Sequence, residues 1–377
     1  MKTAIRAGIG LARAIYALIK LFPTRNKVTF ISRQGLEMPL DFRLIVDQLS
    51  LDCPRLEVQV LCRPLSKGLA GLRYLPHLAV QAYHIATSKV VVLDSYCIPV
   101  CVLRHKPALK VIQIWHAVGA FKQFGFSILD KAEARSGGGL NGYELATAMY
   151  MHQNYDLVIA SSEHSAHCYA EAFNCDPSQV EIIALPRVDL LTDETRMAQI
   201  QATILASYPE LGTKKNIIFA PTFRRSGSIH EQIHQLSDAI DDTKYNLIIK
   251  VHPLTPVEDE DPRAIVIREF STLEMLSVSD YLVTDYSAIT YEMLLLNKPV
   301  FFYHLDCDDY ESVRGFYTPL TDFPISQFSD AHALAQAIAQ DQFDLVAIKE
   351  FITGAVVHQS GNTARLTDII KTHCHGT

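Results

Sequence analysis

Residues 279–303 carry a strand–turn–helix–strand pattern, and this pattern restricts the fold more than any other feature of the sequence. An apolar run over 281–283 ends at Thr284 and Asp285, and a second apolar run covers 300–303. Between the two runs, apolar residues recur at helical spacing until a proline, whose preceding residue disfavours helix. Two strands joined by one helix pair in parallel, so the pattern predicts a β-α-β unit.

The start of the predicted helix is a candidate anion-binding site. A turn of this kind leaves backbone N–H groups free at the carboxyl end of a strand, and Ser287 adds a hydroxyl donor. An ordinary N-capping serine explains the same residues equally well. The motif by itself leaves both interpretations open.

Strand-like segments alternate with helix-like segments along the rest of the chain. Such alternation implies an α/β fold, with parallel sheets covered by helices on both faces. The 377 residues, 49% apolar and 20% charged, are enough for large buried cores. We expect two domains, at residues 27–205 and 206–377. Apolar runs predict strands at 27–32, 57–62, 89–93, 110–115, 156–160, 180–185 and 264–267, and one strand within each of 216–224 and 245–253.

Charge and cysteine content argue against several classes of protein. The net charge of −7 argues against a nucleic-acid binder. The eight cysteines are scattered without a CxxC pair, which fits reduced thiols in a cytosolic compartment better than a disulfide framework. No cluster of carboxylates resembles a metal site, so we expect neither a metal nor another cofactor.

Residues 1–26 form a separate segment that we expect to be helical. Arg6, Arg13 and Lys20 are spaced by seven and lie on one helix face beside largely apolar residues. Three charges argue against a transmembrane span, and a signal-peptide cleavage site is lacking. A basic stripe on an apolar helix is typical of a helix lying in a membrane interface against anionic lipid. The alternative is a helix packed on the body of the protein.

A histidine follows a predicted strand in each half of the chain. His116 comes directly after 110–115 and precedes a loop that contains Gly119 and Gly125, and His252 follows a strand of the second half. Ligands of parallel sheets bind beyond the carboxyl ends of the strands. We therefore expect two Rossmann-like domains whose sheets face a central cleft with one histidine on either wall, the layout of GT-B glycosyltransferases. The alternative for His116 is a histidine that only caps a strand.

The chain also carries a series of short motifs. They are Trp115-His116, Pro186-Arg-Val-Asp189, Ala220-Pro-Thr-Phe-Arg224, Lys250-Val-His-Pro253, Thr284-Asp-Tyr-Ser287, Lys298-Pro299, Arg314-Gly-Phe-Tyr317 and Gly361-Asn-Thr-Ala-Arg365. In this order they resemble the CDP-glycerol glycerophosphotransferase family, the teichoic-acid primases and polymerases. The resemblance runs from about residue 27 to the C-terminal helix. The short chain and the Trp-His-Ala-x-Gly-Ala form look more like primase-type members that add a single unit.

Three positions depart from the family pattern. Many members have glycine after the Trp-His pair, where this chain has Ala117. An aspartate is common in the helix after the serine, where Glu292 stands here, and a glycine before the Pro-Arg-x-Asp motif appears as Ala184.

The resemblance implies transfer of glycerol phosphate from CDP-glycerol to a hydroxyl of a lipid-linked glycan at the cytoplasmic face of the membrane, releasing CMP. His116 would be the base, since a neutral histidine accepts a proton readily near pH 7. His252 would stabilise charge on the leaving CMP, and such a transfer requires no metal in principle. The donor site implied by the family comprises Gly119, Arg187, Pro221, Thr222, Arg224, Lys250, Asp285, Ser287, Ala288, Glu292 and Arg314, with Arg314 reaching a phosphate and Glu292 a ribose hydroxyl.

Other functions compete with this one. Bacterial sialyltransferases, which use CMP-sialic acid, share a His-Pro motif and a downstream serine motif, but their pattern does not demand His116 with its tryptophan and its lysine-bearing loop. A membrane-surface scaffold without activity is disfavoured because both histidines and the anion-binding turn are intact. The sequence does not separate CDP-ribitol from CDP-glycerol as the donor.

Overall fold

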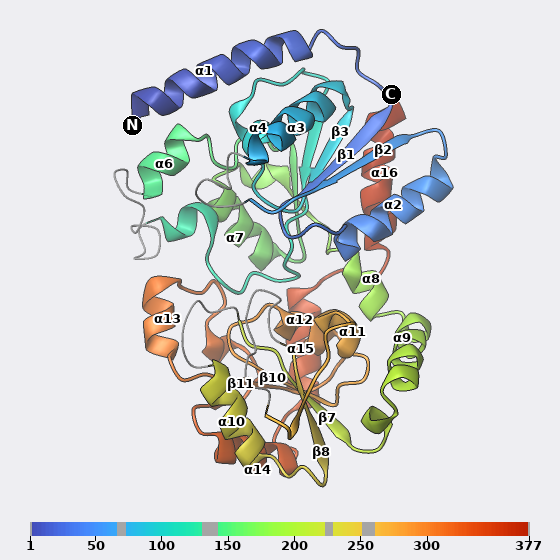
Figure 1. Cartoon of the computed structure of the whole chain (residues 1–377), viewed down its shortest axis with the longest axis vertical. Coiled ribbons are helices and arrows are strands. Elements are labelled where there is room, and N and C mark those ends of the chain that lie inside the picture. Colours follow the sequence, from blue (N-terminus) through green and yellow to red (C-terminus); the bar gives the residue numbers. More distant parts are fainter. Residues whose placement is uncertain (1, 66–72, 130–141, 223–228, 251–260, 376–377) are drawn as a thin grey trace. The chain divides into compact units, whose positions relative to one another are not determined.

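The computed structural model describes residues 2–65, 73–129, 142–222, 229–250 and 261–375, drawn in colour in Figure 1. The chain forms two compact units, and neither is continuous in sequence. The first unit comprises Met1–Asp189, Ser312–Gly315 and Val356–Thr377, and the second comprises Leu190–Glu311 and Phe316–Ala355.

The first unit is built on a parallel sheet. Its strands are β1 (Lys27–Ser32), β2 (Glu57–Cys62), β3 (Val90–Leu93), β4 (Lys110–Gln113), β5 (Leu157–Ala160) and β6 (Val180–Ile182). They pair in the order β2-β1-β3-β4-β5-β6. Strand β3 is buried along its whole length, as expected for a sheet covered on both faces. The longer helices are α1 (Lys2–Ile19), α2 (Leu40–Asp52), α3 (Leu75–Thr87), α7 (Glu163–Phe173) and α16 (Asn362–His375), and the shorter ones are α4 (Ile98–Val102) and α6 (Gly142–Ala148).

The second unit has a parallel sheet of its own. Its strands are β7 (Lys215–Phe219), β8 (Tyr245–Ile249), β9 (Ala264–Val266), β10 (Tyr281–Thr284), β11 (Val300–Tyr303) and β12 (Gln327–Phe328). They pair in the order β12-β11-β10-β7-β8-β9. Its helices are α9 (Glu194–Ser207), α10 (Ile229–Ala239), α11 (Thr272–Met275), α12 (Ile289–Leu295), α14 (Ala331–Ala339) and α15 (Leu345–Ala355). The short helices α8 (Arg187–Leu191) and α13 (Cys307–Val313) include two of the four points where the chain passes between units, and the other two follow residues 315 and 355.

The strand orders show where each unit has room for a ligand. The second sheet, read in chain order, has the order 3-2-1-4-5-6 of dinucleotide-binding folds, whereas the first begins 2-1-3 as in flavodoxin-like folds. The order reverses between β1 and β3 in the first unit and between β7 and β10 in the second. Ligands of such folds bind beyond the carboxyl ends of the strands at these reversals. The predicted α/β architecture with two parallel sheets is confirmed, and the pairing of β10 with β11 is the expected β-α-β unit.

The C-terminal helix lies in the first unit, although we expected residues 206–377 to form one domain. The carboxylate of Asp189 accepts hydrogen bonds from the backbone N–H groups of Asn362 at 3.0 Å and Thr363 at 2.7 Å. A carboxylate at a helix start satisfies free N–H groups and complements the helix dipole. Leu366 and Ile370, one turn apart in α16, are at most 1% exposed. The division between the units falls after Asp189, earlier than the expected boundary at residue 205.

Helix α1 packs on the first unit through the face that carries its basic residues. Ile9 and Tyr16 are buried on this face. Between them, the Arg13 side chain donates from Nε to the Val102 carbonyl oxygen at 2.8 Å, and its guanidinium lies 4.6 Å from the centre of the Tyr150 ring. The expectation that the whole basic stripe meets anionic lipid is therefore wrong for Arg13, because this part of the stripe coincides with the buried face.

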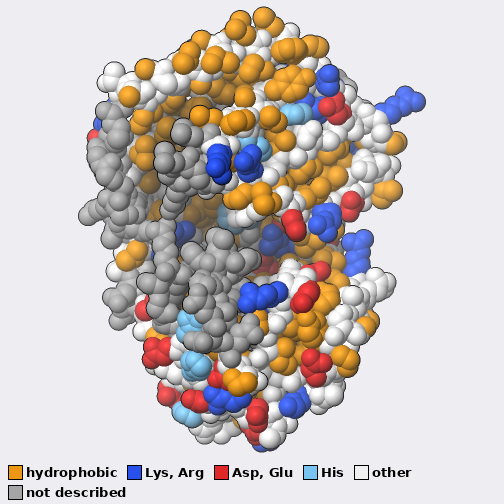
Figure 2. Space-filling model, in the orientation of Figure 1, with side chains coloured by type: hydrophobic (Ala, Val, Ile, Leu, Met, Phe, Trp, Pro, Cys, Tyr) orange, Lys and Arg blue, Asp and Glu red, His pale blue; other side chains and the backbone are white. Residues whose placement is uncertain are grey.

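The opposite face of α1 is exposed and uncharged. Leu11, Ile15 and Leu18 are 65%, 52% and 68% exposed and lie three or four residues apart, so they form one stripe. Hydrophobic side chains gather over α1 in Figure 2. No helix in the described ranges combines the length and the apolar character that a membrane crossing requires.

Gly125 opens the short 3-10 helix η2 (Gly125–Ile128), and its conformation excludes a side chain. Its φ is +59°, and a β-carbon placed there would lie 2.1 Å from the carbonyl oxygen of Ala172 in α7. We expect Gly125→Ala to lower the free energy of unfolding by about 2–4 kcal/mol, because it adds backbone strain and forces η2 away from α7. Urea denaturation measures this change.

Gly10→Ala is the matched control, since a β-carbon at this exposed position of α1 meets no described atom within 4 Å. It should leave stability unchanged or raise it by up to about 1 kcal/mol, because alanine favours helix. Equal stabilities for the two variants would contradict the steric account of Gly125.

Candidate active site

Three residues meet beyond the carboxyl ends of the first unit's central strands. Ser32 ends β1, Asp94 follows β3, and His116 follows β4 after two further residues. The Ser32 hydroxyl donates to Asp94 Oδ2 at 2.7 Å. The His116 ring lies against the backbone of Asp94, with 2.8 Å between Nδ1 and the carbonyl oxygen. Sequence positions 32, 94 and 116 are brought together because β1, β3 and β4 are neighbours in the sheet.

Trp115 places His116 through an unusual backbone conformation. Its φ is +59°, in the left-handed region that bulky residues rarely adopt. Its N–H donates to Gln113 Oε1 at 2.9 Å, and its ring stacks on Phe124 with 4.4 Å between the ring centres. Its ring centre is also 4.1 Å from that of His116. The surrounding packing holds a strained residue directly before the histidine, and such strain is concentrated at functional sites.

The hydrogen bonding of His116 determines its tautomer. The Asp94 carbonyl oxygen accepts only, so Nδ1 carries the proton and Nε2 is left with a lone pair. The Gln34 amide nitrogen lies 3.2 Å from the same Nδ1, but the fixed acceptor at Asp94 decides the proton's position. Burial lowers the pKa of His116 to about 4, and the nearby Arg187 and Lys122 cations act in the same direction. The imidazole is therefore neutral at pH 7, with Nε2 able to accept a proton.

Asp94 is a candidate site residue that the sequence reasoning missed. Its side chain is 3% exposed, and Oδ1 has no hydrogen-bond partner among the described residues. Burial raises the pKa of Asp94 to about 6, and the Asp41 carboxylate adds to the effect. The signal was present in the sequence, because an acidic residue directly follows the apolar run at 89–93.

The Arg187 side chain is bonded to the carboxylate of Asp41 within the first unit. Its Nε donates to Asp41 Oδ2 at 2.9 Å, and its backbone N–H donates to Asp41 Oδ1 at 2.9 Å. Asp41 is 2% exposed, so the pair is a largely buried contact between α2 and α8. Arg187 thus ties two elements of the first unit together and contributes positive charge near His116.

The loop after His116 contains the predicted residue Gly119 and is bonded to the segment that contains another, Arg314. Gly119 is buried in this loop, and the Gln123 N–H donates to the Gly315 carbonyl oxygen at 3.1 Å. The half-buried Arg314 precedes Gly315, and the segment Ser312–Gly315 belongs to the first unit. Arg314 therefore belongs to the first unit, next to a residue that is bonded to the loop containing Gly119.

In the second unit, Asp285 joins the two loops at the strand-order reversal. Its carboxylate is fully buried, and Oδ1 accepts from the backbone N–H groups of Thr222 at 2.8 Å and Tyr286 at 2.6 Å. The Thr284 hydroxyl donates to the Ala220 carbonyl oxygen at 2.7 Å. These bonds bring together the predicted residues Pro221, Thr222 and Asp285.

The first turn of α12 lies directly beyond this junction. Ser287 and Ala288 are half-buried, and their carbonyl oxygens accept the bonds that begin the helix, from Thr290 N at 3.2 Å and Tyr291 N at 3.1 Å. The Glu292 side chain, one turn further on, is 2% exposed. Ser287 and Ala288 therefore adjoin the loop residues, whereas Glu292 is part of the buried interior of the unit.

Lys250 makes bonds within its own unit. Its Nζ donates to the carbonyl oxygens of Ile267 at 2.6 Å and Phe270 at 2.5 Å, and burial lowers its pKa. The ammonium ties the end of β8 to the segment after β9. Arg224 and His252 lie outside the described residues.

The described residues contain no group of three or more His, Cys, Asp or Glu side chains arranged to hold a metal ion. What the described geometry provides is a neutral imidazole with a free Nε2 in the first unit. The second unit provides an ordered junction of two loops and a helix start. Such an imidazole can accept a proton, and such a helix start can bind an anion.

Curated proteins similar to this chain are named as teichoic acid enzymes. A chain from Bacillus spizizenii named teichoic acid ribitol-phosphate primase is 33% identical over 390 residues, covering 98% of both chains. A teichoic acid glycerol-phosphate primase of the same organism is 31% identical over 255 residues, covering 65% of this chain and 64% of its own.

A solved structure of the wall teichoic acid polymerase TagF shares the fold with a TM-score of 0.76. The match is 17% identical in sequence and covers 99% of this chain and 97% of the solved one. The sequence model of the CDP-glycerol:poly(glycerophosphate) glycerophosphotransferase family matches residues 14–371. The chain therefore belongs to the CDP-glycerol:poly(glycerophosphate) glycerophosphotransferase family.

Proposed function

We propose that this protein transfers an alditol phosphate from a CDP-alditol to a hydroxyl of a lipid-linked acceptor, releasing CMP, in the synthesis of a teichoic-acid-like polymer. The reaction takes place at the cytoplasmic face of the membrane. Family membership supports the reaction type. The primases among its relatives support the addition of a first unit to the acceptor.

The observation that carries the proposal is the state of His116. Attack on the β-phosphorus requires the acceptor hydroxyl to lose its proton, and His116 Nε2 is unprotonated at neutral pH because Nδ1 donates to the Asp94 carbonyl oxygen. Trp115 and Asp94 hold the ring from two sides, so little reorganisation is required when the acceptor binds. In this proposal the proton moves from the acceptor oxygen to Nε2 as the new P–O bond forms.

The leaving CMP gathers negative charge, which donors in the second unit would stabilise. Asp285 orders the loops that carry Thr222 and Ser287, and N–H groups at the start of a helix attract phosphate. We assign Ser287, Ala288, Thr222, Arg224 and His252 to the donor phosphates. Three predicted donor residues act mainly by holding the surrounding structure: Glu292 is buried, Lys250 is bonded to backbone carbonyl oxygens, and Arg187 is bonded to the Asp41 carboxylate.

The identity of the alditol is the finer question. The family description names CDP-glycerol, which is the donor we propose first. CDP-ribitol is the second candidate, because the relative that matches 98% of this chain and of its own length is named a ribitol-phosphate primase. Ribitol has two more hydroxymethine groups than glycerol, so the two donors differ in the length of the alditol that the site must hold.

The exposed face of α1 supports attachment to the membrane that holds the acceptor. Leu11, Ile15 and Leu18 are more than half exposed, and an amphipathic helix with such a stripe lies in the membrane interface. Since Arg13 is engaged by the first unit, insertion of apolar side chains is the main contribution to binding. An enzyme held at the surface searches for a lipid-linked acceptor in two dimensions.

The reaction is tested by incubating the purified protein with CDP-glycerol, CDP-ribitol, CDP and CMP-sialic acid, with a lipid-linked acceptor, and measuring CMP release. We expect CMP from one or both CDP-alditols, and roughly 100-fold slower release from His116→Ala with donor binding little changed. His167→Ala, an exposed position in α7, is the control and should retain full activity. Release of CMP from CMP-sialic acid alone would overturn the proposal in favour of sugar transfer.

The pH profile of turnover tests the assignment of the base. Because the pKa of His116 is about 4, turnover should be constant from pH 7 to about 5 and fall tenfold per pH unit below about 4. A base with the ordinary pKa of about 6.5 would lose activity below that pH instead. Unfolding restores that ordinary pKa, so stability also declines as the pH falls below about 6.5 and the folded fraction must be followed by circular dichroism.

The membrane attachment is tested by sedimentation with vesicles. A variant with Leu11→Gln, Ile15→Gln and Leu18→Gln should keep its thermal stability, because these side chains are exposed, and bind vesicles at least about 100-fold more weakly. Leu51→Gln, at an exposed position of α2, is the matched control. Activity on a soluble acceptor analogue should survive in both. Unchanged sedimentation of the triple variant would show that α1 serves only to pack on the first unit.

A further inference from the structure

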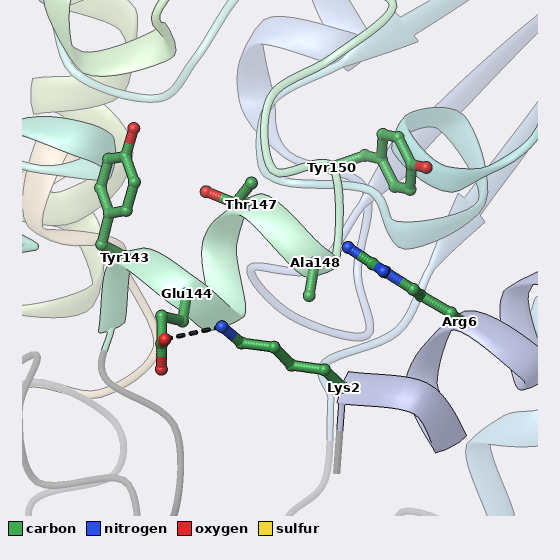
Figure 3. Close-up of a pocket in the computed structure, with 7 residues that line it drawn as sticks. All are labelled: Lys2, Arg6, Tyr143, Glu144, Thr147, Ala148 and Tyr150. Carbon is green, nitrogen blue, oxygen red and sulfur yellow. Dashed lines mark hydrogen bonds and ion pairs between the residues drawn. The ribbon is translucent and has the colours of Figure 1, made fainter.

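A cavity of about 370 Å³ opens between the first turns of α1 and helix α6, within the first unit. Its volume is that of a small-ligand site, and no residue of the candidate active site lines it. The lining residues are Lys2, Arg6, Tyr143, Glu144, Thr147, Ala148 and Tyr150, as Figure 3 shows.

The two cations that line this cavity differ in their contacts. Lys2 Nζ lies 2.6 Å from Glu144 Oε1, which links α1 to α6. Arg6, one helical turn further along, extends toward Tyr150 in Figure 3, and its guanidinium has no hydrogen bond or ion pair with any described residue. Arg13 of the same stripe is by contrast bonded to the Val102 carbonyl oxygen. Arg6 is therefore available to a ligand.

The lining favours a phosphate that carries one negative charge. Lys2, Arg6 and Glu144 sum to a charge of +1, from two cations and one carboxylate. A guanidinium binds phosphate oxygens through two parallel hydrogen bonds, and the Arg6 side chain that carries it is exposed. The carboxylate of Glu144 disfavours a doubly charged phosphate by repulsion. A phosphodiester matches this set better than inorganic phosphate does.

We propose that this cavity binds the phosphodiester headgroup of a membrane lipid. The inference rests on the membrane attachment in the proposed function and gives that attachment a specific site. Arg6 precedes Leu11 by about 7.5 Å along the helix axis, and Leu11 begins the exposed apolar stripe of α1. Arg6 lies on the face of α1 opposite to this stripe, and a helix with its side chains is about 10–12 Å across, so insertion of the stripe into the hydrocarbon leaves Arg6 at the depth of the lipid phosphates.

The test measures sedimentation with phosphatidylcholine vesicles that either lack or contain phosphatidylglycerol. Arg6→Gln should lose most of the preference for vesicles that contain phosphatidylglycerol. We expect it to bind these vesicles roughly fivefold to tenfold more weakly, since one cation at the surface of an anionic membrane contributes about 1 kcal/mol. Binding to pure phosphatidylcholine should be unchanged, because the choline cation beside each of its phosphates is repelled by Lys2 and Arg6. Arg6→Lys should keep part of the preference, because it retains the charge without the two-pronged geometry.

Arg43→Gln is the matched control, an exposed arginine of α2 that removes the same charge elsewhere in the first unit. Equal losses for Arg6→Gln and Arg43→Gln would overturn the proposal, because they would indicate general attraction without a site. Competition by millimolar inorganic phosphate would overturn it in favour of a free phosphate ligand. Thermal unfolding verifies that the variants fold. The assay contains no donor or acceptor, so failure of CMP release overturns the proposed reaction without affecting this result.

Discussion

The carboxylate of Asp189 is the point on which the layout of the first unit depends. It accepts hydrogen bonds from the start of α16, with Asn362 and Thr363 as donors, at the place where the chain leaves for the second unit. The last helix of the chain is thereby attached to the unit that contains the first strand. This contact joins two of the family motifs, Pro186-Arg-Val-Asp189 and Gly361-Asn-Thr-Ala-Arg365.

The candidate chemistry follows from strand order. In each unit the candidate site residues lie beyond the carboxyl ends of strands at or next to the reversal of strand order. At such a reversal the helices on opposite faces of the sheet diverge and leave space for a ligand. In the first unit the strained Trp115 and the Asp94 carbonyl oxygen hold His116 neutral with Nε2 free. In the second, the buried Asp285 serves to order the loops. A rigid support for the groups that meet substrate is what phosphoryl transfer requires, since it is catalysed by positioning and charge stabilisation.

The two faces of helix α1 have different surroundings. Its basic face meets the first unit through Arg13 and Tyr16, while Leu11 and Leu18 on the other face remain exposed. In the membrane attachment that we propose, insertion of the exposed stripe would hold the first unit at a fixed depth, because the contacts of α1 with the protein determine how far the stripe projects. Attachment by apolar area also makes membrane binding less dependent on salt than attachment by charge alone.

The sequence by itself determined the class of fold, because strand and helix periodicity are local properties that apolar spacing records directly. It also located His116 and the start of α12, since residues that follow a buried strand must emerge at the carboxyl edge of a parallel sheet. Only the tertiary structure decided the contacts between distant segments. These contacts depend on strand order and on the return of the chain from the second unit to the first, and neither is encoded in the spacing of neighbouring residues. Examples are the contacts of Asp94 with His116, of Arg187 with Asp41, and of α16 with the rest of the first unit.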